Sequence, residues 1–219
     1  MDAELVLVLI WTYGMATFNW VIKESKLPWL KLDIEFPFEE MLNEAKNIRK
    51  YFVEHRAEEQ IHGYRHKGWA SLSLHGISHN HTNHFSSYGY GSNRETPYKW
   101  TEISSKCPIT TNFFKNNYPC DNYYRLRFML LEPEGYIAPH NDMQEHKLSP
   151  VNIALNHPKG CLMKMVGHGT VPFKQGEAYL LDVGNTHAYY NKSHEDRYHI
   201  IVHGNYASNK KWKELKKIR

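Results

Sequence analysis

The sequence has few cysteines, little net charge, and no internal repeat or low-complexity tract. Its 219 residues include 3 cysteines, which lie far apart and form no Cys-x-x-Cys pair. Three distant cysteines cannot build a full disulfide framework, so we expect a protein of a reducing compartment. The net charge of +4 is too small to require a nucleic-acid partner, and we expect none.

The rest of the composition is that of one globular domain. Hydrophobic residues make up 41% of the chain, aromatic residues 14% and charged residues 23%. These proportions supply a hydrophobic core and exclude a disordered, collagen-like or coiled-coil protein. Histidine is the unusual component, with 15 residues, and its side chain is the commonest metal ligand in proteins.

One uncharged stretch, residues 5–22, is long enough to be considered as a membrane span. Polar residues interrupt it, so we expect residues 1–26 to form an apolar segment that packs as a helix, with a marginal membrane anchor as the alternative. A signal peptide is not expected, because Asp2 and Glu4 occupy the place of a positively charged region. If residues 5–22 span a membrane, Lys23 and Lys26, which follow them, would keep the main domain on the cytoplasmic side. Both interpretations predict a cytoplasmic protein.

Residues 27–219 are expected to form a single domain with helices on both sides of a β-rich part. Apolar residues recur at helical spacing in residues 37–56, with acidic residues in the first turn, and predict a helix packed on a core. A second helix is predicted near residues 108–118, and a basic helix over residues 209–219. Residues 63–100 are rich in Gly, Ser, Asn, His and Tyr, which is typical of strands and long loops that carry functional sites.

The pattern changes after residue 121. Short runs of β-branched and aromatic residues follow one another, and Gly, Pro and other turn residues separate them. Such closely spaced short strands are typical of a β-sandwich or a barrel, and not of alternating strands and helices. We therefore expect the core of the domain at about residues 121–206.

Three residues in this region suggest a metal site. His140 and Asp142 are two residues apart on an extended segment, so their side chains share one face and can reach one point. His187 follows a later strand and a turn, and it can supply a third ligand from a neighbouring strand. Two imidazoles and one carboxylate form the facial triad of non-haem Fe(II) oxygenases. We therefore predict that His140, Asp142 and His187 bind the metal and are catalytic.

Arg197 begins the next predicted strand, residues 197–202. A lone charge inside a strand is costly unless it meets an anion. A diacid cosubstrate that chelates the metal at one end needs its far carboxylate held, and the planar, always charged guanidinium of Arg suits that role. Arg197 is therefore a candidate for binding such a cosubstrate.

These residues and their surroundings resemble the aspartyl/asparaginyl β-hydroxylase-like family of Fe(II)/2-oxoglutarate-dependent dioxygenases. The resemblance covers about the last hundred residues well, and GWASLSLHG (residues 68–76) resembles the family's upstream region less specifically. It is carried by LEPEGYIAPH (131–140) before the first ligand, GEAYLLD (176–182) before the second, and HAYYN (187–191) leading to Arg197.

The resemblance implies a mostly β fold, with a double-stranded β-helix core of the jelly-roll or cupin type and flanking N-terminal and C-terminal helices. It implies Fe(II), 2-oxoglutarate and O₂ as cofactors. The reaction it implies is hydroxylation of a C–H bond, which we expect in an amino-acid side chain. The partner is then a free amino acid, a peptide or a protein.

Two positions depart from the family pattern. Vertebrate members lack the carboxylate ligand that Asp142 supplies, so this chain resembles the branch with a complete triad. Asn152 stands near the place where some members carry an Arg that helps to bind 2-oxoglutarate. The resemblance thus assigns Arg197 and Asn152 to cosubstrate binding.

Two other classes of function stay open from the residues. A cupin-like metal-dependent isomerase or binding protein would share the fold and the ligands without needing Arg197. A nucleic-acid-binding module is suggested only by the aromatic residues and the basic tail. The histidines between His75 and His84 invite a second metal site, but a polar loop is the preferred interpretation. His199 shares a strand face with Arg197, and we expect it to be a packing residue.

Overall fold

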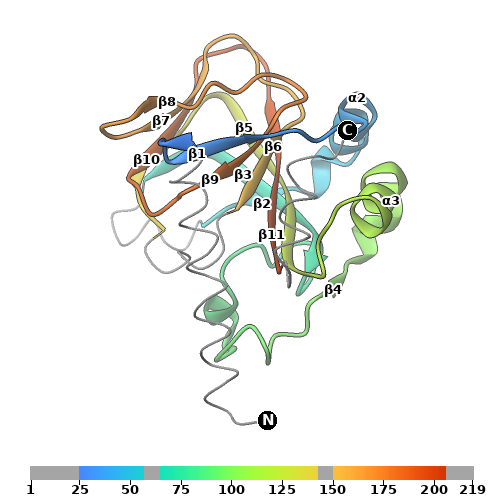
Figure 1. Cartoon of the computed structure of the whole chain (residues 1–219). Coiled ribbons are helices and arrows are strands. Elements are labelled where there is room, and N and C mark those ends of the chain that lie inside the picture. The colour runs from blue at the N-terminus through green and yellow to red at the C-terminus, as the bar shows by residue number, and fades with distance from the viewer. Residues whose placement is uncertain (1–24, 57–64, 143–149, 206–219) are drawn as a thin grey trace.

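The computed structural model describes residues 25–56, 65–142 and 150–205. In these residues, eleven strands form one curled sheet in which paired strands run antiparallel. Figure 1 shows the sheet folding over on itself, with two helices together at one side. The strands are β1 (Trp29–Leu32), β2 (Val53–Glu54), β3 (His66–Gly76), β4 (Lys99–Trp100), β5 (Asn122–His140), β6 (Val151–Ala154), β7 (Cys161–Met165), β8 (Gly169–Thr170), β9 (Ala178–Leu181), β10 (His187–Asn191) and β11 (Arg197–Asn205).

Strand β5 connects the two halves of this sheet. One of its edges pairs with β3, while its other edge pairs first with β11 and then, after a bend, with β10. The bend lies at Glu134, which has a φ of 58°, and Gly135. A Cβ at Gly135 would lie 2.7 Å from the carbonyl oxygen of Glu132, so only glycine fits there. The bend lets one strand of 19 residues belong to both layers.

The two layers face each other and enclose a core. The larger layer contains β1, β9, β6, β11 and the first half of β5, and the smaller one contains the second half of β5 with β10, β7 and β8. Buried side chains from both layers meet between them, among them Met129, Leu131, Met163, Tyr179 and Tyr189. This arrangement is a jelly roll, a double-stranded β-helix, and it confirms the predicted mostly β fold class.

The helices cover the outer face of the larger layer (Figure 1). Helix α2 (Phe38–Asn47) and helix α3 (Pro108–Asn116) pack with β3, β5 and β11 into a second hydrophobic cluster. Alternate residues of β5 divide between the two cores, because successive side chains of a strand point to opposite faces. Leu126 and Phe128 face the helices, whereas Met129 and Leu131 face the interior of the jelly roll.

The predicted helix over residues 37–56 is shorter than expected, because α2 ends at Asn47. A 3₁₀ turn (Arg49–Tyr51) follows, and then β2 pairs with β3. Backbone hydrogen bonds to β3 therefore replace those of a continued helix, and this long-range pairing overrides the helical pattern. The second predicted helix is confirmed as α3. Strand β5 continues without a break through Glu134 and Gly135.

Several predictions concern residues outside the described part of the chain. They are the apolar segment of residues 1–26, of which residues 1–24 lie outside, its possible membrane association through residues 5–22, and the helix of residues 209–219. No helix within the described residues has the length and apolar character needed to cross a membrane. The division into residues 1–26 and a single domain of residues 27–219, and the cytoplasmic location, stay predictions.

Candidate active site

The strand register brings the two predicted histidine ligands together. His140 ends β5, His187 begins β10, and the two residues are direct partners across this antiparallel pair. Their imidazole rings lie with centroids 4.3 Å apart. Asp142 follows β5, and its backbone N–H donates to the carbonyl of Val183 at 3.0 Å. The segment after β9 therefore holds the backbone of Asp142 in position.

Both histidines are oriented by backbone carbonyls. Nδ1 of His140 lies 2.9 Å from the oxygen of Ala138, and Nδ1 of His187 lies 2.8 Å from the oxygen of Asn185. A carbonyl oxygen only accepts, so each Nδ1 carries the hydrogen and donates it. Each Nε2 is then the nitrogen that bears the lone pair, which is the form that coordinates a metal.

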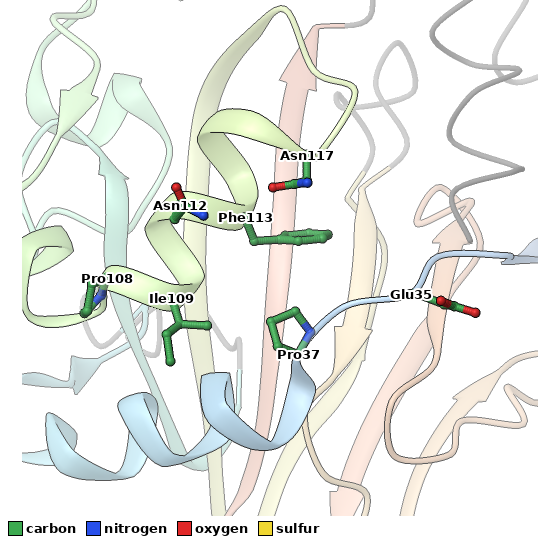
Figure 2. A pocket seen from close by; sticks show the side chains of 7 residues that line it. All are labelled: Glu35, Pro37, Pro108, Ile109, Asn112, Phe113 and Asn117. Atoms are coloured by element: carbon green, nitrogen blue, oxygen red, sulfur yellow. The ribbon is translucent and has the colours of Figure 1, made fainter.

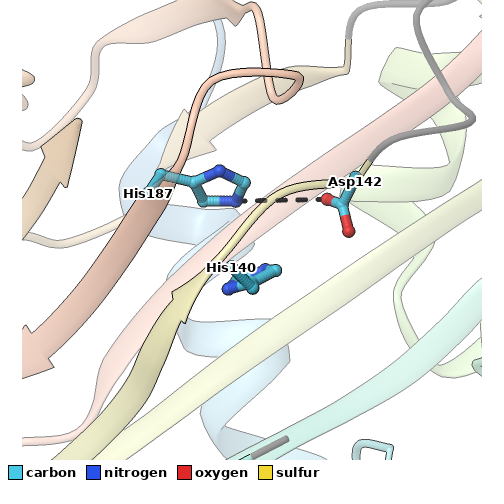
Figure 3. Close-up of side chains that lie close together, drawn as sticks. All are labelled: His140, Asp142 and His187. Carbon is cyan, nitrogen blue, oxygen red and sulfur yellow. Dashed lines mark ion pairs between the residues drawn. The ribbon is translucent and has the colours of Figure 1, made fainter. Parts of the chain in front are cut away.

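The three predicted ligands fit a metal ion. One ligand atom from each of His140, Asp142 and His187 lies within 4.8 Å of the others, and no other group of three such side chains occurs in the described ranges. Figure 3 shows the two imidazoles and the carboxylate turned toward one another. Oδ2 of Asp142 is 4.0 Å from Nε2 of His187, a separation that two ligands of one ion can adopt.

The protonation states of the histidines suit metal binding. Burial, and next the nearby His187, lower the pKa of His140 to about 4. Burial also lowers the pKa of His187 below its usual value. Both rings are therefore neutral near pH 7, and a neutral imidazole is the form that a metal requires.

Arg56 contacts the carboxylate of the triad, which the sequence pattern did not indicate. Its Nη2 donates to Oδ1 of Asp142 at 3.3 Å, on the oxygen that does not face His187. Its guanidinium also lies over the ring of Trp69, 5.9 Å from the centroid. Arg56 and Trp69 thus form a wall beside the triad.

Arg197 is a buried cation next to the triad. Its side chain lies over the ring of Tyr189 at 5.2 Å and near that of Phe173 at 6.0 Å, and only 5% of the residue is exposed. Within the described residues no carboxylate lies within ion-pair distance of it, and its Nε has no hydrogen-bond partner. Burial lowers its pKa to about 10, so the guanidinium stays charged at neutral pH.

Asn152 and Arg197 both contact the same ring nitrogen of His199. Oδ1 of Asn152 is 2.6 Å from Nδ1 of His199, and Nη2 of Arg197 is 2.9 Å from the same nitrogen. His199 is fully buried and packs against Phe173, and burial lowers its pKa well below the usual value. Asn152, His199 and Arg197 form a buried polar row across β6 and β11.

All the predicted site residues line one cavity of about 60 Å³. The same cavity contains basic residues that the sequence reading missed. A signal for two of them is present in the sequence, because Arg125 and Arg127 alternate with apolar residues in β5 and must therefore share the inner face. The additional lining residues with basic side chains are His55, Arg56, Arg125, Arg127 and His203.

A larger hollow of about 540 Å³ lies on the other side of the molecule, between α2 and α3 (Figure 2). Its walls consist mostly of apolar side chains, among them Pro37, Ile109 and Phe113, and of the uncharged polar side chains of two asparagines. Glu35 is the one ionisable side chain among its lining residues. The groups needed for metal chemistry lie in the smaller cavity, and not in this groove.

The histidines from His75 to His84 do not converge on one point. His75 packs against the rings of Trp100 and Tyr123, and His79 pairs with Glu102. His84 contacts the hydroxyl of the nearby Ser86. His79 and His84 lie in the polar stretch after β3, in agreement with the preferred interpretation, whereas His75 is a residue of β3 itself.

A jelly roll that holds two histidines and an aspartate within reach of one ion is typical of the non-haem Fe(II) oxygenases. The sequence profile described as aspartyl/asparaginyl beta-hydroxylase matches residues 34–205. The chain therefore belongs to the aspartyl/asparaginyl β-hydroxylase family. It is a 2-oxoglutarate-dependent dioxygenase that uses Fe(II), 2-oxoglutarate and O₂, and this membership decides against the cupin-like isomerase.

Solved structures of similar shape include a prolyl-4-hydroxylase from Pseudomonas putida, with 10% identity, 86% of this chain and 99% of that chain covered, and a TM-score of 0.45. A prolyl hydroxylase from Trichoplax adhaerens, in complex with a hypoxia inducible factor peptide fragment, has 11% identity, coverage of 99% and 98%, and a TM-score of 0.49. The epimerase SnoN from nogalamycin biosynthesis has 12% identity, coverage of 85% and 81%, and a TM-score of 0.49. No curated protein sequence matches the chain.

Proposed function

We propose that this enzyme hydroxylates a C–H bond of an amino-acid side chain, with His140, Asp142 and His187 as ligands of Fe(II) and Arg197 as the anchor of 2-oxoglutarate. The proposal rests on two observations in one cavity: three ligand atoms converge there, and Arg197 is buried with no carboxylate within ion-pair distance among the described residues. The metal, once bound with 2-oxoglutarate, supplies activation of O₂.

The chain's own residues prepare the metal position. The carbonyls of Ala138 and Asn185 hold the two imidazoles in the tautomer that presents Nε2. Arg56 holds one oxygen of Asp142 and leaves the other on the side of His187. Ligands fixed in this way lose little side-chain entropy when they coordinate an ion, which favours binding.

In this proposal Arg197 binds the carboxylate of 2-oxoglutarate that lies away from the metal. A guanidinium that is desolvated and faces no acidic side chain gains most from an anion that enters the cavity. The rings of Tyr189 and Phe173 flank it, so they exclude water and restrict the directions from which a carboxylate can approach. The ring of Tyr189 lies 5.8 Å from that of His187 and 5.2 Å from the guanidinium carbon of Arg197, so one small diacid can reach both Arg197 and the metal position.

The support for an amino-acid side chain as the acceptor is the description of the family as aspartyl/asparaginyl beta-hydroxylase. A peptide or protein substrate is the form we favour. A free amino acid is the alternative, and it would need no contacts outside the cavity.

The test is turnover with a panel of free amino acids and peptides, in the presence of Fe(II), 2-oxoglutarate and O₂. The expected result is a substrate that gains one oxygen atom, with succinate and CO₂ formed in equal amounts. His187→Ala should abolish all three products, namely the oxygenated substrate, succinate and CO₂, whereas His168→Ala, at an exposed position of the β7–β8 hairpin, should leave them unchanged. Succinate release that is independent of His187 would contradict the proposal.

A further inference from the structure

The buried residue His199 contacts the guanidinium of Arg197. Nη2 of Arg197 lies 2.9 Å from Nδ1 of His199, and both side chains leave the same face of β11 because the residues are two apart. The rings of Tyr189 and Phe173 flank the guanidinium. A ring face restrains where a guanidinium lies, but it does not fix the direction of each N–H group. The hydrogen bond to His199 does fix that direction.

The direction of this hydrogen bond follows from the groups that form it. A guanidinium has N–H donors and no acceptor, so Nδ1 of His199 supplies the lone pair, and the hydrogen of the ring is on Nε2. Burial, and next the charge of Arg197, lower the pKa of His199 well below its usual value, which keeps the ring neutral. Oδ1 of Asn152 lies 2.6 Å from the same Nδ1. A half-turn of this amide presents its N–H₂ group instead and suits the same tautomer.

Packing alone does not explain a histidine at this position. His199 is fully buried, and its ring lies against that of Phe173 with centroids 5.0 Å apart. Its Nε2 has no hydrogen-bond partner within the part of the chain that the structure describes. A buried polar atom without a partner costs free energy, and an apolar side chain would fill the same space without that cost. The contact with Arg197 supplies a reason for an imidazole here.

The sheet holds His199 from both sides. In the strand register it lies opposite Met129 of β5 on one side and opposite Ala154 of β6 on the other. Its ring therefore offers Arg197 an acceptor at a fixed position. A guanidinium that is already oriented by such an acceptor loses less side-chain entropy when an anion binds to it, and this strengthens binding.

We infer that His199 is a positioning residue for the cosubstrate: Nδ1 of its neutral ring accepts a hydrogen bond from Arg197 and orients the remaining N–H groups of the guanidinium toward 2-oxoglutarate. This inference rests on the proposed function, which assigns Arg197 to 2-oxoglutarate. Nε of Arg197 has no partner among the described residues, and it is one of the donors that remain for a carboxylate. His199 acts through Arg197 and is assigned no contact of its own with the cosubstrate.

The test is a calorimetric titration of 2-oxoglutarate into the full chain loaded with Mn(II), with three substitutions of His199. His199→Leu removes the acceptor and keeps an apolar side chain in the core. His199→Asn places an amide oxygen where Nδ1 stands, whereas the longer side chain in His199→Gln places its amide nearer the position of Nε2. The Leu and Gln variants should bind 2-oxoglutarate about tenfold more weakly, because a hydrogen bond to a charged group is lost. His199→Asn should stay within about threefold of the unaltered protein.

Three controls separate positioning from a general loss of structure. The affinity for Mn(II) should be the same in all His199 variants, because this residue is not one of the three ligands. His75→Phe, at a histidine that does not line the cavity, should change neither affinity. The double variant Arg197→Ala/His199→Leu should bind 2-oxoglutarate no more weakly than Arg197→Ala, since a residue that acts only through Arg197 has no effect once Arg197 is removed.

The tautomer of His199 can be measured in the unaltered protein, so this part of the test does not depend on any variant that folds. Nitrogen NMR of the chain loaded with diamagnetic Zn(II) distinguishes a ring nitrogen that carries hydrogen from one that carries a lone pair. The expected result is a lone pair on Nδ1 of His199 and hydrogen on Nε2. Hydrogen on Nδ1 would show that His199 donates to Asn152 and does not accept from Arg197, which would overturn the inference.

The titrations have their own contrary outcomes. Unchanged 2-oxoglutarate affinity in folded His199→Leu, equal losses in the Leu and Asn variants, or additive losses in the double variant would each overturn the inference. The proposed function fails separately, if Arg197→Ala binds 2-oxoglutarate as tightly as the unaltered protein. Weak binding by Arg197→Ala together with full affinity in His199→Leu would remove this inference alone.

Discussion

At the scale of single residues, the site depends on which atom of each side chain faces the cavity. Backbone carbonyls hold the Nδ1 atoms of His140 and His187, so geometry and not titration selects the coordinating nitrogen. Asp142 divides its two oxygens between Arg56 and the metal position. Arg197 keeps a full charge in a nearly dry environment. Each of these arrangements can be tested by one substitution.

The first prediction at this scale concerns the metal. His187→Ala should abolish tight binding of a divalent ion, because two ligands remain and one of them is paired with Arg56. Asp142→Ala should remove most of the activity. Calorimetric titration of Mn(II) checks the first expectation and succinate release checks the second, with His168→Ala as the control in both. Stoichiometric metal in folded His187→Ala would exclude this histidine as a ligand.

The second prediction concerns the cosubstrate. Arg197→Lys keeps the charge but loses the planar fork, so 2-oxoglutarate should bind more weakly while the metal still binds. Arg197→Ala should cost more, about 2–5 kcal/mol of binding free energy for a desolvated charge pair. The measurement is a titration of 2-oxoglutarate into metal-loaded protein. Equal affinities in all three proteins would show that Arg197 has only a structural role.

At the scale of secondary-structure elements, one buried carboxylate joins the two helices on the outer face of the sheet. Glu44 of α2 accepts hydrogen bonds from the backbone N–H groups of Ile109 and Thr110, and from the hydroxyl of Thr110. These N–H groups belong to the first turn of α3, where no partner exists within the helix. Glu44 thus caps α3 from another element, at a site where the helix dipole favours a negative charge.

We therefore expect Glu44→Ala to lower the free energy of unfolding by about 2 kcal/mol, because it leaves buried N–H groups at the start of α3 without an acceptor. Urea denaturation measures the change. The control is Glu39→Ala, which removes an exposed carboxylate from the same helix and should change the stability by less than about 0.5 kcal/mol. A similar loss in both variants would contradict the capping role.

At the scale of the whole molecule, burial of neutral histidines makes the stability depend on pH. Burial lowers the pKa values of His75 and His157 to about 4, and it lowers those of His55 and His199 well below their usual value. An unfolded chain takes up protons on these residues below about pH 6.5, whereas the folded chain does not until the pH is much lower. Acid therefore favours the unfolded state.

The protein should accordingly lose stability as the pH falls from about 6.5 to about 4, and keep this contribution in full above that window. His75→Phe retains a ring between Trp100 and Tyr123 but removes one titrating group. The free energy of unfolding of this variant should therefore fall less steeply with decreasing pH than that of the unaltered protein. Urea denaturation at several pH values in this window gives the slopes. Identical slopes for the two proteins would show that His75 does not contribute.

The sequence by itself determined the chemistry of the central site. The spacing of His140 and Asp142, the later His187 and the charge of Arg197 are local features, because alternation along a strand decides which side chains share a face. The same alternation marked the β-rich half of the chain. The pairing of His140 with Asp142 needed no knowledge of which strands are neighbours, whereas the inclusion of His187 assumed a neighbouring strand, which the register of β5 and β10 supplies.

Only the tertiary structure decided which distant residues meet. The pairing of β2 with β3 shortened the predicted helix and placed His55 and Arg56 beside the triad. The register of β5 against β11 set Arg125 and Arg127 apart from Arg197 within one cavity. Sheet closure and register depend on contacts between segments far apart in the chain, and a local pattern fixes the face of a residue but not its partner.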